Sequence, residues 1–178
     1  EYNNYLEAEF EESRKHDKAL VYDFLSDIWE GYRHGNAADF ETSPETGVSK
    51  KSLLELGEKL ATLPEGKKYF RKISKIFKDR LTNIQNDQLD WGSAEMLAYA
   101  SLLVEGHPIR VSGQDVERGT FSHRHAVVKT EDTEEEVITL NMLSEQQAQF
   151  SIYNSFLSEY GVLGYEYGYS LACPKGLT

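Results

Sequence analysis

The sequence predicts an α/β fold in which a helical arm precedes a region of helices and strands with a mostly parallel sheet. Apolar residues recur at helical spacing through much of residues 1–88. A helix pattern, a glycine and a short apolar run then follow one another, which is the order of a crossover unit. A second short strand pattern leads directly into a further helix pattern. We therefore divide the chain into a helical connecting arm, residues 1–88, and a partial α/β domain, residues 89–178.

Composition narrows the class of protein. The 178 residues are 39% hydrophobic, which is enough for one proper core. The net charge of −11 argues against nucleic-acid binding, because that needs a basic footprint. There is no run of 18 apolar residues, so the sequence predicts no membrane-spanning helix. The only cysteine, Cys173, excludes an internal disulfide, and we interpret it as a packing residue rather than a reactive thiol.

The arm is predicted to contain three helices. The first covers residues 6–32, where apolar pairs at helical spacing form one broad stripe that Gly31 and Gly35 end. Ser49 or Ser52 caps the second, which stops near Pro64. The third follows Gly66, and its lysines and arginines are predicted to mark a solvated face. Its apolar set is Tyr69, Phe70, Ile73, Ile76, Phe77, Leu81 and Ile84.

The α/β region is predicted to begin with a helix that Asp90 caps and Gly106 ends. The small residues of this helix suit close packing on a sheet. The acidic run at residues 129–136 is expected to be a solvated turn. The other predicted elements are strands at residues 108–112, 137–140 and 150–153, a loop at residues 114–125, and a helix at residues 158–172.

The last helix carries the most informative residue. Gly161, Gly164 and Gly168 recur at spacings of three and four, although each glycine costs a helix roughly 1 kcal/mol relative to alanine. We therefore expect a neighbouring backbone to come close. Glu159 stands where this helix begins, and we expect it to be rigid and partly shielded from water. It is either a first-turn acid that interacts with the helix dipole or a group that holds a proton for a bound heterocycle.

The loop at residues 114–125 follows a strand end, where α/β proteins place ligand-binding loops. Arginine pairs well with carboxylates, so the loop could bind anions or guide a substrate. A structural salt-bridge network remains the alternative. No complete set of metal ligands lies nearby, so no metal site is predicted. The candidate residues are Asp115, Arg118, His123, Arg124 and His125.

Several runs in a fixed order resemble one enzyme family. That family is the decarboxylating, thiamine diphosphate-dependent component of the 2-oxoglutarate dehydrogenase complex. The runs are Asp-Trp-Gly-Ser-Ala-Glu at 90–95, Arg-Val-Ser-Gly-Gln-Asp at 110–115, Arg-Gly-Thr-Phe at 118–121, Arg-His-Ala-Val at 124–127, Tyr-Asn-Ser at 153–155, Leu-Ser-Glu at 157–159 and Gly-Tyr-Glu-Tyr-Gly-Tyr at 164–169.

This resemblance implies a thiamine-enzyme pyrimidine-binding domain and a role in the tricarboxylic acid cycle. The family decarboxylates 2-oxoglutarate and passes the succinyl group to the lipoyl domain of a partner acyltransferase. Glu159 falls where thiamine enzymes hydrogen-bond the cofactor's aminopyrimidine ring and favour its imino tautomer. Leu157 is expected to contact the same cofactor. The loop carrying Arg118 and His125 is expected near the active-site entrance.

The resemblance also implies that this is an internal piece of a longer enzyme. The Gly-Asp-Gly motif that holds magnesium and the diphosphate does not occur in the sequence. In the family, active sites form between the two subunits of a homodimer. The isolated chain is therefore expected to be inactive. A bacterial cytoplasm is the default location, or the mitochondrial matrix for a eukaryotic source.

Two alternatives stay open at this stage. Another thiamine diphosphate enzyme, such as a transketolase or pyruvate dehydrogenase relative, would carry a similar glutamate segment. The acidic surface and the amphipathic first helix would also suit a non-catalytic helical interaction module.

Overall fold

The computed structural model describes residues 2–15 and 25–176. Helix α1 (Tyr2–Ser13) belongs to a first unit, residues 1–32, and none of its residues is buried. The prediction of one helix over residues 6–32 is confirmed within α1 and wrong for residues 25–32, which form turns. Part of that predicted helix, residues 16–24, lies outside the described residues.

The reason for the wrong prediction is visible in the backbone. Leu25 has a φ of 58° and Gly31 a φ of 86°, and neither value is compatible with a continuous right-handed helix. The apolar side chains of Ile28 and Tyr32 are exposed. Most helical stability in proteins comes from packing an apolar face, and Ile28 and Tyr32 are not buried in such a face.

The second unit, residues 33–178, contains the other named elements. A short 3-10 helix, η1 (Ala37–Phe40), starts at a capping box. The Asn36 side chain accepts from the Ala38 amide, and the Asp39 carboxylate accepts from the Asn36 amide. The ion pair between Arg33 and Asp39 joins the same turn.

Helices α2 (Lys50–Ala61), α3 (Arg71–Gln85) and α4 (Trp91–Val104) confirm the predicted helices of residues 49–106. The side chain of Ser49 caps α2 by accepting from the Ser52 amide at 3.2 Å. Asp90 caps α4 by accepting from the Ser93 amide at 2.7 Å. Tyr69, expected at the start of α3, instead bridges Thr130.

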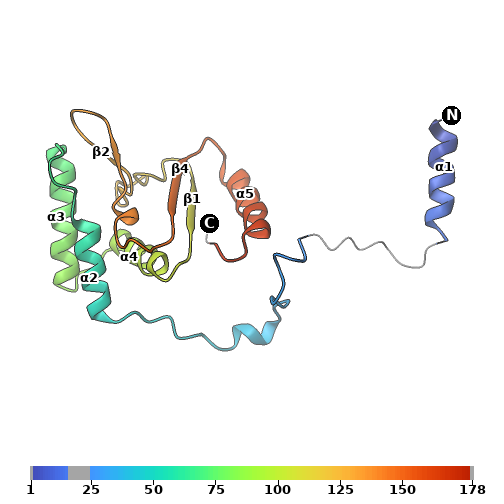
Figure 1. Cartoon of the computed structure of the whole chain (residues 1–178), viewed down its shortest axis with the longest axis horizontal. Helices are drawn as coiled ribbons and strands as arrows, with labels where there is room; N and C mark the ends of the chain where they lie inside the picture. Colours follow the sequence, from blue (N-terminus) through green and yellow to red (C-terminus); the bar gives the residue numbers. More distant parts are fainter. Residues whose placement is uncertain (1, 16–24, 177–178) are drawn as a thin grey trace. The chain divides into compact units, whose positions relative to one another are not determined.

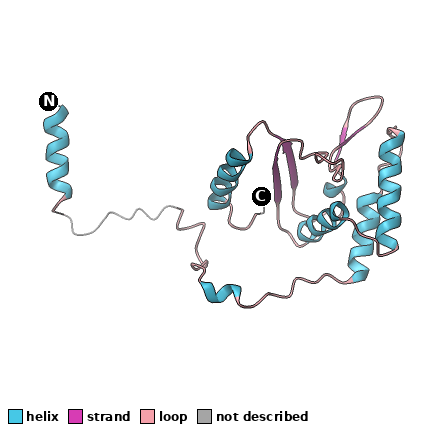
Figure 2. Cartoon of the chain, turned by 180° about the vertical axis from the view of Figure 1, so that it is seen from behind, coloured by secondary structure: helices cyan, strands magenta, loops and turns pink. Residues whose placement is uncertain are grey.

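The α/β prediction is confirmed by two parallel strands, β1 (Ile109–Gly113) and β4 (Phe150–Asn154). Their register runs from Ile109 opposite Phe150 to Gly113 opposite Asn154. Two shorter strands, β2 (Val128–Lys129) and β3 (Glu136–Val137), pair antiparallel. The sheet of β1 and β4 has α5 (Glu159–Ala172) on one side and α4, with α2 and α3 behind it, on the other (Figures 1 and 2).

The predicted strand at residues 137–140 is wrong beyond Val137. A 3-10 helix, η2 (Thr139–Asn141), stands there instead. The Asn141 side-chain amide explains the difference, because it occupies both backbone groups of Phe150. Its Nδ2 donates to the Phe150 carbonyl, and its Oδ1 accepts from the Phe150 amide, each at 2.9 Å. A side chain therefore takes the place of a strand partner.

One hydrophobic core joins α2 and α3 to α4 and the sheet. Leu60 of α2, Ala100 of α4 and Phe150 of β4 are each fully buried in it. Residues 50–88 therefore share a core with the residues that follow them. The division into an arm, residues 1–88, and an α/β domain, residues 89–178, stays a prediction.

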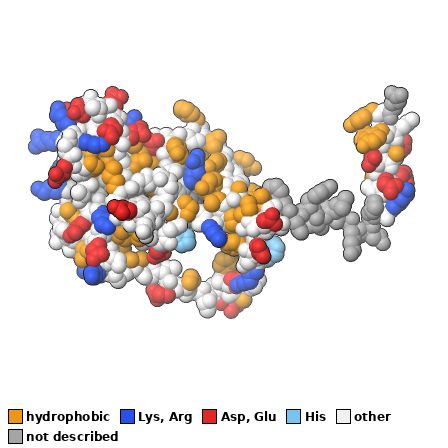
Figure 3. All heavy atoms as spheres, in the orientation of Figure 1, with side chains coloured by type: hydrophobic (Ala, Val, Ile, Leu, Met, Phe, Trp, Pro, Cys, Tyr) orange, Lys and Arg blue, Asp and Glu red, His pale blue; other side chains and the backbone are white. Residues whose placement is uncertain are grey.

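Helix α5 confirms the last predicted helix, but none of its residues is buried. Hydrophobic side chains stand on the surface over it (Figure 3). A Cβ added to Gly164 or Gly168 would meet nothing within 4 Å. The close neighbouring backbone expected at these glycines is therefore not found in the described chain.

None of the helices in residues 2–15 and 25–176 has both the length and the apolar character needed to cross a membrane.

Candidate functional site

The carboxyl ends of β1 and β4 meet at one edge of the sheet, because the strands are parallel and in register. The loop of residues 114–127 leaves this edge after Gly113. The segment of residues 155–158, called the connector below, leaves it after Asn154 and leads into α5. Ligands of open α/β sheets bind at this edge. Residues from the loop and the connector are therefore the first candidates for a site.

Glu159 is the first residue of α5. The preceding Ser158 has the extended backbone of an N-cap, but its side chain makes no capping hydrogen bond. A carboxylate in a first turn interacts favourably with the helix dipole. The side chain is exposed, so the expected partial shielding from water is wrong for this chain. The physical reason is that no residue of α5 is buried by the rest of the described chain.

Leu157 lies in the connector with 45% of its surface exposed. Its carbonyl oxygen accepts a hydrogen bond from the Gln114 side chain at 3.3 Å. The connector is thereby attached to the loop that follows β1.

Asp115 and Arg118 pair with each other inside that loop. The hydrogen bond from Arg118 lowers the pKa of Asp115, and the same bond raises the pKa of Arg118. Arg118 also donates to the Ser122 hydroxyl at 3.3 Å. Asp115 and Ser122 both have positive φ values, 53° and 54°. The contacts of Arg118 with Asp115 and Ser122 therefore hold a tightly turned stretch of the loop together.

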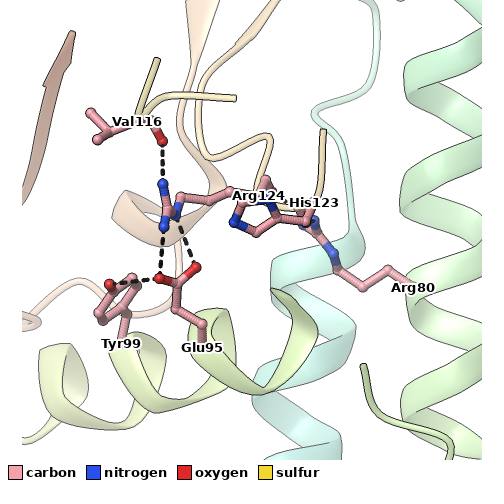
Figure 4. A network of polar contacts seen from close by, with 6 residues as sticks. All are labelled: Arg80, Glu95, Tyr99, Val116, His123 and Arg124. Atoms are coloured by element: carbon pink, nitrogen blue, oxygen red, sulfur yellow. Dashed lines mark hydrogen bonds and ion pairs between the residues drawn. The ribbon is translucent and has the colours of Figure 1, made fainter. Parts of the chain in front are cut away.

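Arg124 is the centre of a polar network that crosses from the loop to α4 (Figure 4). Its guanidinium donates to both carboxylate oxygens of Glu95, at 2.8 and 2.9 Å, and to the Val116 carbonyl at 2.7 Å. The Tyr99 hydroxyl donates to the same carboxylate at 3.1 Å. The structural salt-bridge alternative therefore describes Arg124 in this chain.

The electrostatics of this network follow from burial and pairing. Burial, followed by the neighbouring Glu95, raises the pKa of Tyr99 to about 12. Burial alone would raise the pKa of Glu95, but the hydrogen bonds from Arg124 and Tyr99 outweigh it and the pKa is lowered. The carboxylate thus stays ionised and keeps its bidentate partner.

Arg80 is buried, so the prediction that the lysines and arginines of α3 mark a solvated face is wrong for this residue. Its Nη2 donates to the carbonyl oxygens of Arg124 at 2.7 Å and His123 at 3.3 Å. Burial lowers its pKa. The signal was available in the spacing: Arg80 follows Phe77 by one helical turn and precedes Ile84 by another, and both are buried.

The two loop histidines lie in different environments. His123 is exposed, whereas His125 is 7% exposed and its buried Nε2 has no hydrogen-bond partner. Burial lowers the pKa of His125, and the nearby Arg80 and Lys72 lower it further. In the part of the chain that the structure describes, no cluster of three His, Cys, Asp or Glu side chains could hold a metal ion.

The candidates do not all converge. Among the described residues, no hydrogen bond or ion pair joins Glu159 to the five candidates of the loop. A pocket of about 280 Å³ opens between α4, β1 and α5, and Glu159 does not line it. Arg110 lines this pocket and lies over the rings of Tyr153 and Tyr165, at 4.5 and 5.3 Å from their centroids.

Comparisons with known proteins extend this picture. Residues 87–177 match the family described as transketolase, pyrimidine binding domain. The chain is 46% identical to the 2-oxoglutarate dehydrogenase E1 components of Brucella ovis and Brucella canis, over 97% of its length. It is 45% identical to that of Brucella melitensis biotype 2 over the same share. In each case it spans only 17% of the relative's length.

Proposed function

Since the chain belongs to the transketolase pyrimidine-binding domain family, we propose that it is the pyrimidine-binding part of a 2-oxoglutarate dehydrogenase of the E1 type. The observation that carries this proposal is 46% identity to such components over nearly the whole chain. The chain spans 17% of their length, so the activity is that of a longer parent enzyme. The same identity favours this function over another thiamine enzyme or a helical interaction module.

In this proposal Glu159 binds the aminopyrimidine half of thiamine diphosphate. Its carboxyl group stands at the sheet edge where such folds take ligands and is open to a partner. A carboxyl group can share a proton with a ring nitrogen, and Leu157 offers an apolar side chain beside it. The residues present therefore fit the aminopyrimidine half of the cofactor. When bound, thiamine diphosphate supplies the electron sink for decarboxylation of a 2-oxo acid.

The rest of the site is assigned to other parts of the parent. We infer that magnesium and the diphosphate are held outside this chain, by a second subunit of a homodimer. The proposed substrate is 2-oxoglutarate, and the acceptor is the lipoyl domain of an acyltransferase component. The name of the relatives as a component supports assembly into a complex. A bacterial cytoplasm remains the proposed location.

Within the loop, the five candidates differ in exposure and in pairing. Arg124 and His125 are held in the fold, and Asp115 is paired with Arg118. Arg118 and His123 are the exposed members. We therefore propose that these two face the substrate or the lipoyl group, with Asp115 ordering the loop.

The test is substitution of Glu159 in the full-length parent. Glu159→Gln keeps the size and hydrogen-bonding capacity of the side chain but cannot hold the acidic proton. We expect a fall in kcat of about a hundredfold or more, as for other positioned proton-transfer groups. Glu145→Gln is the matched control, because it makes the same change at an exposed site outside α5 and outside the loop. Equal activity of the Glu159→Gln and Glu145→Gln enzymes would refute the assignment.

A further inference from the structure

Glu117 and Asn154 cap each other's backbone. The Glu117 amide donates to Oδ1 of Asn154 at 3.2 Å, and the Asn154 amide donates to Oε1 of Glu117 at 3.2 Å. One residue lies in the loop after β1 and the other ends β4. The two bonds are reciprocal, so the pair fixes both the separation and the relative orientation of two chain segments.

The connector depends on such bonds because hydrophobic burial does not hold it. Phe156 is fully exposed, and Leu157 is 45% exposed. The Ser155 amide donates to the Gly113 carbonyl at 2.7 Å, and Gln114 donates to the Leu157 carbonyl. Every one of these bonds leads back to residues 113–117.

Glu117 is itself anchored in the core. Its carbonyl oxygen accepts from the amide of Ala126 at 2.8 Å, and Ala126 is 2% exposed. A continuous path therefore runs from the buried Ala126 through Glu117 to Asn154. From Asn154 the connector leads directly to Glu159.

We propose that Glu117 and Asn154 are a positioning pair that fixes the direction in which α5 presents Glu159. This inference rests on the proposed function, because it assumes that Glu159 binds the cofactor. Neither residue needs to touch the cofactor. The pair also attaches the loop carrying Arg118 to the end of β4, from which the connector leads to Glu159. Both parts of the proposed site therefore depend on the same two hydrogen bonds.

The contact itself is tested by amide hydrogen exchange in the 178-residue chain. Glu117→Ala removes the acceptor, whereas Glu117→Gln keeps Oε1. We expect Glu117→Ala to speed exchange at Asn154 and Ser155 by about fivefold, the effect of losing one ordinary hydrogen bond. Glu117→Gln should stay near the unsubstituted chain, as should Glu145→Ala, a change at an exposed site. Unchanged exchange in Glu117→Ala would overturn the proposal.

The positioning role is tested in the full-length parent by titrating thiamine diphosphate. We expect Glu117→Ala and Asn154→Ala each to raise the cofactor concentration for half-maximal activity by about fivefold or more. Glu117→Gln should restore it, because this side chain keeps Oε1 as the acceptor of the Asn154 amide. The double alanine variant should raise it further than either single variant, because Glu117→Ala removes the acceptor of the Asn154 amide and Asn154→Ala removes the acceptor of the Glu117 amide.

The outcomes separate this inference from the proposed function. Faster exchange with an unchanged cofactor requirement would overturn the positioning role while leaving the contact intact. If Glu159→Gln also left activity unchanged, the proposed function would fail as well. A higher cofactor concentration for half-maximal activity in the alanine variants, with rescue by Glu117→Gln, would support both.

Discussion

The carbonyl oxygen of His123 lies only 2.6 Å from the position that a Cβ on Gly92 would occupy. The first turn of α4 and the loop after β1 are therefore in backbone contact. The buried Arg80 side chain donates to this same carbonyl at 3.3 Å, so the loop cannot withdraw without losing that hydrogen bond. We predict that Gly92→Ala destabilises the chain by about 1–3 kcal/mol, the usual cost of overpacking, measured by urea unfolding.

Gly164→Ala is the control for that substitution. It is also a glycine in a helix, but an added Cβ would meet nothing within 4 Å. Alanine is the better helix former, so we expect a gain of roughly 0.5–1 kcal/mol. If both alanine variants were destabilised alike, the close approach at Gly92 would not be the cause. A loss of stability at Gly164 in the parent alone would reveal the neighbouring backbone that the glycine pattern predicts.

Arg124 provides a test of the polar network. Arg124→Lys keeps the charge but loses the bidentate contact to Glu95 and the bond to Val116. We expect a loss of about 1.5–3 kcal/mol in the free energy of unfolding, as for hydrogen bonds to charged groups. Arg118→Lys should cost less than about 1 kcal/mol, because its ion pair is exposed. Equal costs would show that Arg124 does not carry the network.

His125 predicts how stability depends on pH. Its folded pKa lies below its ordinary value of 6.5, because burial and nearby cations disfavour the charged form. The unfolded chain therefore binds a proton at higher pH than the folded chain does. The stabilisation is complete above pH 6.5 and is lost as the pH falls towards the folded pKa.

The measurement is the free energy of unfolding between about pH 8 and pH 5.5, a range that carboxylates affect little. We expect a decrease towards acid that is smaller in His125→Gln, which cannot be protonated. His123→Gln is the matched control, because that histidine is exposed. An identical pH dependence in the His125→Gln chain would contradict this assignment.

Local signals in the sequence predict most of the second unit. The caps at Ser49 and Asp90 are readable because their hydrogen bonds are made within one turn. Arg80 could also have been placed inside, because its spacing from Phe77 and Ile84 puts it on the buried face. These elements depend on neighbours in sequence, so a single sequence contains what is needed.

Features that depend on distant partners were not predictable in the same way. The Asn141 side chain bonds the backbone of Phe150 in place of a strand partner. No local sequence pattern predicts this contact. Glu159 is exposed because no other part of the described chain covers α5. We therefore expect the environment of Glu159 in the parent enzyme to depend on segments outside these 178 residues.

We predict that the purified 178-residue chain does not turn over 2-oxoglutarate when thiamine diphosphate and magnesium are supplied. The sequence offers a carboxyl group for the aminopyrimidine ring but no Gly-Asp-Gly motif for the diphosphate. Release of carbon dioxide from labelled substrate is the measurement, with the full-length parent as the positive control. Turnover by the isolated chain would show that the second half of the site is not required.

The most direct test of the central claim is a crystal structure of the full-length parent with thiamine diphosphate bound. We predict that the Glu159 carboxyl lies within hydrogen-bond distance, about 2.6–3.2 Å, of a nitrogen of the aminopyrimidine ring. We also predict that the exposed surface of α5 is covered there by other parts of the parent. A Glu159 side chain that faces bulk solvent, far from the bound cofactor, would contradict the account.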